Sequence, residues 1–144
     1  MAINLIDYLS KKFLVNDFRL DRNCSIRKAV SENNVSNEFG VYLIFAHDLL
    51  PSNLLYIGKA GEINQKGNRS KQGIAKRLCN KQEKIPRVTF FKQKMNELEC
   101  ALVFAWAITM PSNKERYLPG LIEAEMMQLY FVENGCLPQW NNRT

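Results

Sequence analysis

The stretch from Gly40 to Gly58, GVYLIFAHDLLPSNLLYIG, decides the fold because two short apolar runs flank a polar turn. Residues 40–46 and 54–58 are rich in aliphatic and aromatic side chains and have the length of ordinary strands. Residues 47–53 contain Asp, Pro, Ser and Asn, which favour turns. The pattern predicts an antiparallel hairpin with a moderately long connection.

The residues before this hairpin predict helices. Apolar side chains between residues 5 and 14 recur at helical spacing, and Asn23-Cys24-Ser25 offers an N-cap for a second helix over residues 26–32. We therefore expect residues 1–38 to form a helical extension that packs on a domain spanning residues 39–144.

The residues after the hairpin predict a mixture of loop, helix and strands. Residues 59–73 are rich in Gly, Lys, Asn and Gln and are typical of a loop, whereas residues 74–83 have helix-forming composition. Residues 88–91 favour a short strand. Residues 98–109, LECALVFAWAIT, favour a buried central strand because they are apolar, β-branched and aromatic.

The C-terminal part predicts two further helices. Residues 112–115 match a capping box, and Pro119 suits the first turn of a longer helix that ends near Glu133, before Gly135. Together these elements predict an α+β fold in which helices flank a small antiparallel or mixed sheet.

The positive charge of the chain is concentrated in one segment. The 144 residues include 20 Lys+Arg and 14 Asp+Glu, which gives a net charge of +6. Residues 59–94 alone carry +9, with eleven basic residues against Glu62 and Glu83, so the remainder carries −3. A basic segment on a mildly acidic background indicates a polyanionic partner, although a solvated surface segment has the same composition.

The composition also argues against several classes of protein. No apolar run approaches the roughly 20 residues that cross a bilayer. The first residues lack the basic and then apolar pattern of a signal peptide, so we expect a cytoplasmic protein without a membrane partner. A zinc site is not expected, because no CxxC pair or histidine cluster accompanies the four cysteines, Cys24, Cys79, Cys100 and Cys136.

Two aromatic signatures stand on the consecutive strands of the predicted hairpin, Gly40-Val41-Tyr42 and Tyr56-Ile57-Gly58. A helix bearing Arg77 follows them, and the C-terminal part adds Glu123 in an apolar helix and Asn141 in a Pro-x-x-Asn ending. Taken singly, the tyrosines are typical of packing residues, and the arginine and glutamate are typical of surface charges. In this order and combination, the five elements resemble the GIY-YIG nuclease superfamily.

The resemblance covers residues 39–141. It implies a domain with a three-stranded antiparallel core sheet, and it implies that this domain hydrolyses DNA phosphodiester bonds with one divalent cation, Mg²⁺ or Mn²⁺. Glu123 is the implied metal ligand, since a carboxylate oxygen suits Mg²⁺. Arg77 is expected to bind the scissile phosphate and offset the charge that grows in the transition state. Tyr42 is the implied general base and Tyr56 the orienting group, or the reverse. An ordinary phenol, with a pKa of about 10, needs nearby cations to act as a base.

Glu125 competes with Glu123 for the metal. Side chains two positions apart on a helix point about 200° apart, so only one of the two can face a given site. The apolar residues Ile122, Met126 and Met127 reproduce the spacing of the superfamily around Glu123, which favours that residue.

The other predicted site residues are assigned to substrate binding: Lys59, Lys66, Arg69, Lys71, Lys76, Lys81 and Asn141. Asn141 has no titratable group and is expected to position the active-site helix or backbone. The loop of residues 59–73 is longer than in minimal members of the superfamily, and we expect it to contact DNA. Lys81 stands where many members carry His or Tyr, and lysine is a poor base at neutral pH.

The expected protein is a small metal-dependent DNA endonuclease. Its specificity is expected to come from the N-terminal segment, the basic loop, a homodimer or an accessory protein. Two alternatives remain at this point: a catalytically inactive nucleic-acid-binding module with the same fold, and a protein-interaction domain.

Overall fold

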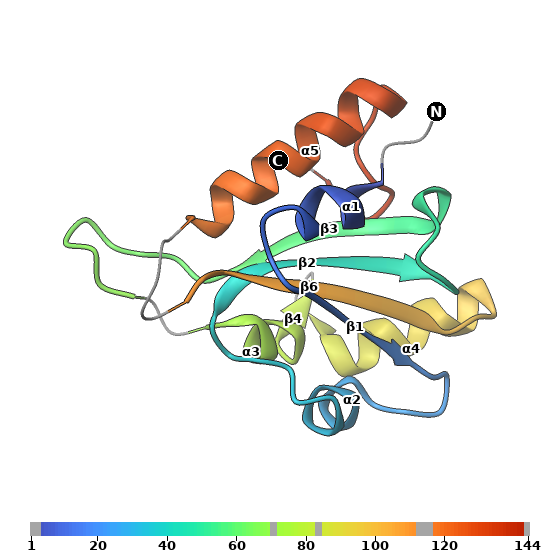
Figure 1. Ribbon diagram of the computed structural model, residues 1–144. Coiled ribbons are helices and arrows are strands. Elements are labelled where there is room, and N and C mark those ends of the chain that lie inside the picture. The colour runs from blue at the N-terminus through green and yellow to red at the C-terminus, as the bar shows by residue number, and fades with distance from the viewer. Residues whose placement is uncertain (1–3, 70–71, 83–84, 112–116, 143–144) are drawn as a thin grey trace.

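The computed structural model describes residues 4–69, 72–82, 85–111 and 117–142. Its centre is an antiparallel sheet of four strands, in the order β1-β6-β2-β3 (Figure 1). These strands are, in chain order, β1 Val15–Leu20, β2 Phe39–Ala46, β3 Leu54–Ala60 and β6 Leu102–Met110. Helices cover both faces of the sheet, so the architecture is α+β, as predicted.

The predicted hairpin is formed by β2 and β3, and the short 3₁₀ helix η1 (Pro51–Asn53) lies in its connection. β2 also pairs with β6, and every residue of β2 except the last is buried. A strand that is covered on both faces has apolar residues at consecutive positions rather than at alternate positions, and this explains the sequence FGVYLIFA of β2.

Two hydrophobic cores lie on opposite sides of the sheet. Helices α2 (Ile26–Glu32), α3 (Ile74–Leu78) and α4 (Arg87–Leu98) cover one face, and α1 (Leu5–Ser10) and α5 (Pro119–Asn134) cover the other (Figure 1). Alternate side chains of β2 enter the two cores. Tyr42 and Ile44 pack toward α3 and α4, whereas Val41, Leu43 and Phe45 pack toward α1 and α5.

The prediction that residues 1–38 form a purely helical extension is wrong, because β1 is the fourth strand of the sheet. It pairs with β6 along its whole length, from Val15 opposite Ala107 to Leu20 opposite Leu102. Only Phe18 and Leu20 of this edge strand are buried. The sheet therefore has one strand more than the three-stranded core that the resemblance implies.

Three predictions for the middle of the chain need correction. Residues 88–91 lie in α4 rather than in a strand, because Phe90, Phe91 and Met95 enter the core at helical spacing. Helix α3 ends at Leu78, before the short hairpin of β4 (Lys81–Gln82) and β5 (Ile85–Pro86). The predicted loop after the hairpin begins only beyond Ala60, and its residues 61–69 form a small hairpin of their own, closed by a bridge between residues 63 and 69.

The long C-terminal helix is confirmed. Pro119 occupies its first turn, and Gly135 ends it in the left-handed conformation with φ of 72°. The predicted central strand is confirmed as β6, although it begins at Leu102 because α4 continues to Leu98. The capping box of residues 112–115 lies outside the described residues. Within the described part of the chain, no helix is both long enough and apolar enough to cross a membrane.

Candidate functional site

The two signature tyrosines lie side by side on the sheet face that α3 and α4 cover. Their ring centroids are 5.9 Å apart, and Tyr42 stands directly opposite Gly58 in the β2–β3 register. A Cβ atom at Gly58 would overlap the Tyr42 ring and would lie 2.6 Å from Cε2 of Tyr56. The glycine is therefore required, because the two rings occupy the space above its Cα atom.

The two tyrosines differ in access to solvent. Tyr42 is completely buried, and its hydroxyl accepts a hydrogen bond of 2.9 Å from Nη1 of Arg87. Tyr56 is half-buried, and among the described residues its hydroxyl has no hydrogen-bond partner. Of the two roles that the sequence leaves interchangeable, direct contact with water or phosphate therefore fits Tyr56 better.

Arg77 is positioned by the way in which α3 begins. The first three N–H groups of this helix, from Ile74 to Lys76, donate to oxygen atoms of residues 36–38 at 3.0–3.1 Å. Gly73 permits this approach, because a Cβ atom there would overlap the carbonyl group of Asn37. Arg77 follows one turn later and is half-buried. Its Nε atom is buried and donates no hydrogen bond within the described part of the chain.

The two candidate glutamates on α5 face different neighbours. Glu125 accepts a hydrogen bond from the Tyr8 hydroxyl and lies 3.9 Å from Nζ of Lys12, so it is engaged with the N-terminal part of the chain. Glu123 is half-buried, and the positive charges of Lys59 and Arg77 act on it. Burial has the larger effect and raises the pKa of the Glu123 carboxyl, whereas these two cations lower it. The geometry thus brings Glu123, and not Glu125, to the other predicted site residues.

The electrostatics of Tyr56 show how closely the site residues gather. Burial, the largest effect, and the neighbouring Tyr42 raise the pKa of Tyr56 to about 12. The positive charges of Arg87 and Arg77 lower this pKa, and Glu123 raises it. Side chains from β2, β3, α3, α4 and α5 therefore lie close enough together for their charges to act on Tyr56.

Three charged side chains at this place have no direct partner within the part of the chain that the structure describes. Lys59, Arg77 and Glu123 make no hydrogen bond through their side chains and no ion pair within 4 Å among the described residues. Arg77 comes from the face of the sheet that carries α3 and Glu123 from the opposite face, and both helices contact β3, the edge strand. Charges that are gathered but not paired leave room for a ligand that carries charge of its own.

Asn141 fastens the C-terminal segment to this same edge. Its side-chain Oδ1 accepts a hydrogen bond from the backbone N–H of Ile57, and its Nδ2 donates to the carbonyl of Ile57, both at 2.9 Å. The N–H of Trp140 donates to the carbonyl of Leu55 at 2.8 Å. Asn141 thus holds the backbone of the Tyr56-Ile57-Gly58 signature, which agrees with the positioning role expected from the sequence.

The predicted substrate-binding lysines lie in different surroundings. Lys59 is half-buried and lines an open cavity of about 240 Å³ together with Met110 and Gly120. Lys66 and Lys76 are exposed, on the hairpin of residues 61–69 and on α3. Lys71 lies outside the described residues, and only the backbone of Lys81 is described.

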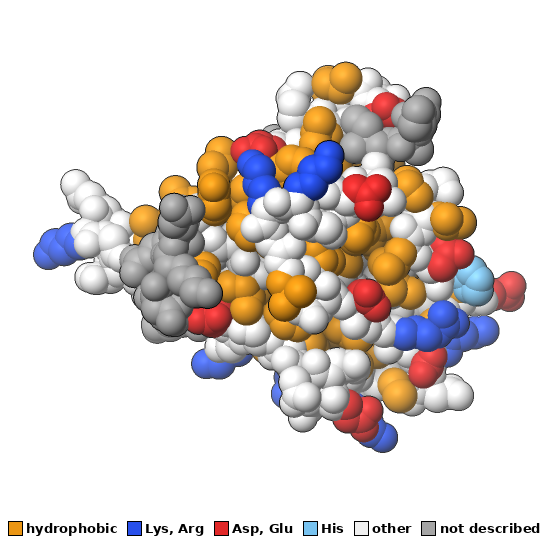
Figure 2. All heavy atoms as spheres, in the orientation of Figure 1, with side chains coloured by type: hydrophobic (Ala, Val, Ile, Leu, Met, Phe, Trp, Pro, Cys, Tyr) orange, Lys and Arg blue, Asp and Glu red, His pale blue; other side chains and the backbone are white. Residues whose placement is uncertain are grey.

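Arg69 is used to hold the hairpin of residues 61–69. Its guanidinium donates hydrogen bonds to the carbonyl groups of Met110 and Pro111, at 3.0 and 3.2 Å, and lies 4.9 Å from the ring centroid of Phe39. The hairpin projects from the body of the molecule, and a basic side chain lies at its tip (Figures 1 and 2). Lys66 on this hairpin is exposed.

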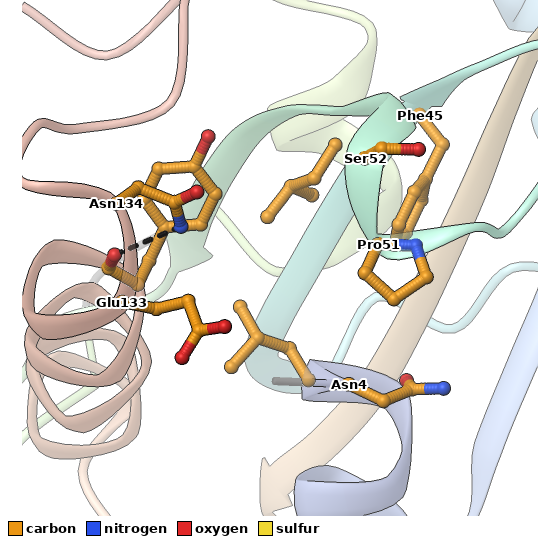
Figure 3. Close-up of a pocket in the computed structure, with 9 residues that line it drawn as sticks. Asn4, Phe45, Pro51, Ser52, Glu133 and Asn134 are labelled. Atoms are coloured by element: carbon orange, nitrogen blue, oxygen red, sulfur yellow. Dashed lines mark hydrogen bonds between the residues drawn. The ribbon is translucent and has the colours of Figure 1, made fainter. Parts of the chain in front are cut away.

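A second, smaller cavity lies away from this site. It has a volume of about 130 Å³ and is bordered by Asn4, η1 and the C-terminal end of α5, where Glu133 and Asn134 lie (Figure 3). The side-chain amide of Asn134 donates to the carbonyl of Tyr130 on its own helix. None of the predicted site residues that the structure describes lines this cavity.

The donor atoms of the site suit one kind of metal ion. Within the described residues, no group of three or more His, Cys, Asp or Glu side chains is arranged as a metal site. Glu123 is a single carboxylate, and its burial makes the ionised form costly without a nearby cation. One hard oxygen ligand fits a cation that keeps most of its waters and shares a phosphate with the protein, as Mg²⁺ does.

Arg87 is a residue of this site that the sequence did not reveal. It is 1% exposed and contacts Tyr42, yet in the sequence it is one of eleven basic residues in a charged segment. The one sequence feature that indicates its burial is the run Val88-Thr89-Phe90-Phe91 that follows it, because an arginine at the start of an apolar run can be buried with that run.

No protein-family model, curated protein or solved structure matches this chain.

Proposed function

We propose that the protein is a divalent-metal-dependent DNA endonuclease of the GIY-YIG type. The observation that carries the proposal is that the charges of Lys59 and Arg77 act on Glu123, and those of Arg77 and Glu123 act on Tyr56, while none of the three charged side chains is paired within the described residues. Two cationic side chains and one carboxylate suit a phosphodiester. The phosphate brings a negative charge for the two cations, and the counter-ion that accompanies it brings a positive charge for the carboxylate.

Glu123 is the residue that would hold the divalent cation, which when bound would supply Lewis acidity at a non-bridging phosphate oxygen. Arg77 can place its guanidinium on the scissile phosphate, and within the described part of the chain its Nε has no acceptor that would compete. Lys59 adds a second positive charge beside the carboxylate.

Tyr56 is the aromatic residue that can reach the substrate. With a pKa of about 12 it is a neutral phenol at pH 7, and it can donate a hydrogen bond to a phosphate oxygen or orient the attacking water. A role as general base would depend on the positive charges of Arg77 and Arg87, which already lower its pKa. The exposed Lys66 and Lys76 can contact neighbouring phosphates.

The test is cleavage of supercoiled plasmid with Mg²⁺ or Mn²⁺, comparing the wild type with Arg77→Ala, Glu123→Gln and Glu125→Gln. We expect metal-dependent nicking or linearisation that falls by about 100-fold or more in the first two variants, as for loss of a transition-state contact. Glu125→Gln is the matched control, since it removes a carboxylate from the same helix but faces Tyr8 and Lys12. It should retain activity within a small factor.

Each contrary result has a distinct meaning. Equal cleavage by all four proteins would reveal a contaminant. Salt-sensitive DNA binding without cleavage in any divalent cation would establish the inactive nucleic-acid-binding module instead. Absence of both binding and cleavage would favour the protein-interaction domain.

A further inference from the structure

Arg87 is a charged side chain in the middle of a hydrophobic core. It is 1% exposed, and its guanidinium carbon lies 5.7 Å from the ring centroid of Tyr42 and 5.9 Å from that of Phe91. Moving a guanidinium out of water is costly, and an apolar side chain of similar size would fill the same space without that cost. Packing alone therefore does not explain an arginine at this position.

The position of Arg87 is fixed at its backbone as well as at its side chain. Arg87 is the first residue of α4, and its N–H donates to the carbonyl of Asn80 at 2.7 Å. Its Nη1 donates to the Tyr42 hydroxyl at 2.9 Å. Because the phenol oxygen accepts from Arg87, its orientation is set from the core side of the sheet.

The Tyr42 hydroxyl lies in turn against the candidate site. The Tyr42 ring packs beside Tyr56 and fills the space over Gly58, so a displacement of Tyr42 would move both neighbours. The charge of Arg87 also acts on Tyr56, where it opposes the effect of burial. Arg87 can thus influence the site through the tyrosine pair while remaining inaccessible to DNA.

We propose that Arg87 is a positioning residue of the nuclease site, which fixes the Tyr42 hydroxyl from behind and so sets the place of Tyr56. The proposal rests on the proposed nuclease function. It assigns the buried arginine to the catalytic step rather than to DNA binding, because its side chain has no surface to offer a phosphate.

The first experiment is a double-mutant cycle on cleavage, with Tyr42→Phe, Arg87→Met and the double variant, all corrected for the folded fraction. We expect each single change to lower kcat by about tenfold or more with KM nearly unchanged, as for a loss of orientation. The double variant should lose no more than either single variant, because both changes break the same contact. Losses that multiply would overturn the proposal, since Arg87 would then act independently of Tyr42.

Arg27→Met is the matched control. Arg27 is exposed on α2, and its charge, like that of Arg87, acts on Cys79, but the hydrogen bond to the Tyr42 hydroxyl comes from Arg87. It should leave kcat unchanged. If Arg87→Met does not fold, Arg87→Lys replaces it in the cycle, because lysine keeps the buried charge and loses the guanidinium geometry. We expect a smaller loss of kcat, again non-additive with Tyr42→Phe.

The second experiment does not depend on cleavage. With 3-fluorotyrosine at position 42, the ¹⁹F resonance should shift in Arg87→Met and stay in place in Arg27→Met. If the wild type does not cleave DNA but the resonance shifts, the contact stands and the proposed function fails. If the wild type cleaves and the resonance shifts but kcat of Arg87→Met is normal, the nuclease stands and the positioning role is overturned.

Discussion

Replacing Asn141 by alanine tests whether one side chain holds the edge of the site. Asn141 makes two hydrogen bonds with Ile57, one to the N–H and one to the carbonyl, both at 2.9 Å. A neutral hydrogen bond contributes about 1 kcal/mol net, so losing both should lower the free energy of unfolding by about 2 kcal/mol. For a domain of 144 residues this corresponds to a fall in Tm of about 4–8 °C.

Two measurements check this prediction. Urea denaturation gives the change in the free energy of unfolding, and amide hydrogen exchange reports on the Ile57 N–H, which should exchange faster in Asn141→Ala. Asn134→Ala is the control, because the Asn134 amide makes one exposed hydrogen bond to its own helix and its removal should cost less than about 0.5 kcal/mol. If the two variants were equally stable, the double hydrogen bond would contribute nothing and the reasoning would be refuted.

Three further predictions follow from the site. Gly58→Ala should lower the free energy of unfolding by about 1–3 kcal/mol, because the tyrosine rings occupy the new Cβ position. Gly120→Ala should be tolerated, because its Cβ would meet only Nζ of Lys59, at 3.5 Å. Equal urea midpoints for the two variants would contradict this packing. Burial raises the pKa of Glu123 in the folded protein, so the unfolded chain loses this proton first and stability falls as the pH rises. Glu123→Gln should therefore be more stable than the wild type at pH 7. The gain should disappear at low pH, where Glu123 is protonated in both the folded and the unfolded protein. Denaturation curves that show a less stable variant at pH 7 would argue against this prediction. Tyr56 has a pKa of about 12 when folded and about 10 when unfolded, so wild-type stability should fall between pH 10 and 12, and more steeply than in Tyr56→Phe; identical slopes would exclude this assignment.

The parts of the fold that the sequence predicted are those in which local pattern and tertiary context agree. The β2–β3 hairpin has strand-length apolar runs on either side of a proline-containing turn, and both faces of β2 are covered. Helix α5 has proline in its first turn and glycine after its last. In such segments the residue that a local rule requires is also the one that the core requires.

The errors arise where the tertiary context overrides local preference. The residues Val88-Thr89-Phe90-Phe91 have high strand propensity, but Phe90, Phe91 and Met95 meet the core as one face of α4. β1 buries only Phe18 and Leu20, and a six-residue edge strand with two buried side chains leaves little periodicity to detect. Its place beside β6 is a long-range pairing that no local pattern contains.

The candidate site shows the same division. Glu123 was favoured over Glu125 from the spacing of apolar residues alone, and the structure separates them because Glu125 contacts Tyr8 and Lys12. Arg69 belongs to a basic loop that is typical of DNA contact, yet its guanidinium donates hydrogen bonds to two backbone carbonyl groups. Arg87 could not be predicted, since burial distinguishes it from the other basic residues of the segment whose side chains the structure describes, and burial is a property of the fold.

The edge position of β3 matters for the candidate site, because α3 and α5, which carry Arg77 and Glu123, both contact this strand. Arg77 and Glu123 approach from opposite faces of the sheet, so a further strand paired with β3 would stand between them. An exposed edge, however, presents unpaired backbone groups that invite association with another chain. Asn141 and Trp140 resolve this conflict, because they satisfy Ile57 and Leu55 with a side-chain amide and one backbone N–H instead of a full strand. β1, the fourth strand, lies at the opposite edge of the sheet, beside β6, where Phe18 and Leu20 enlarge the core away from the β3 edge.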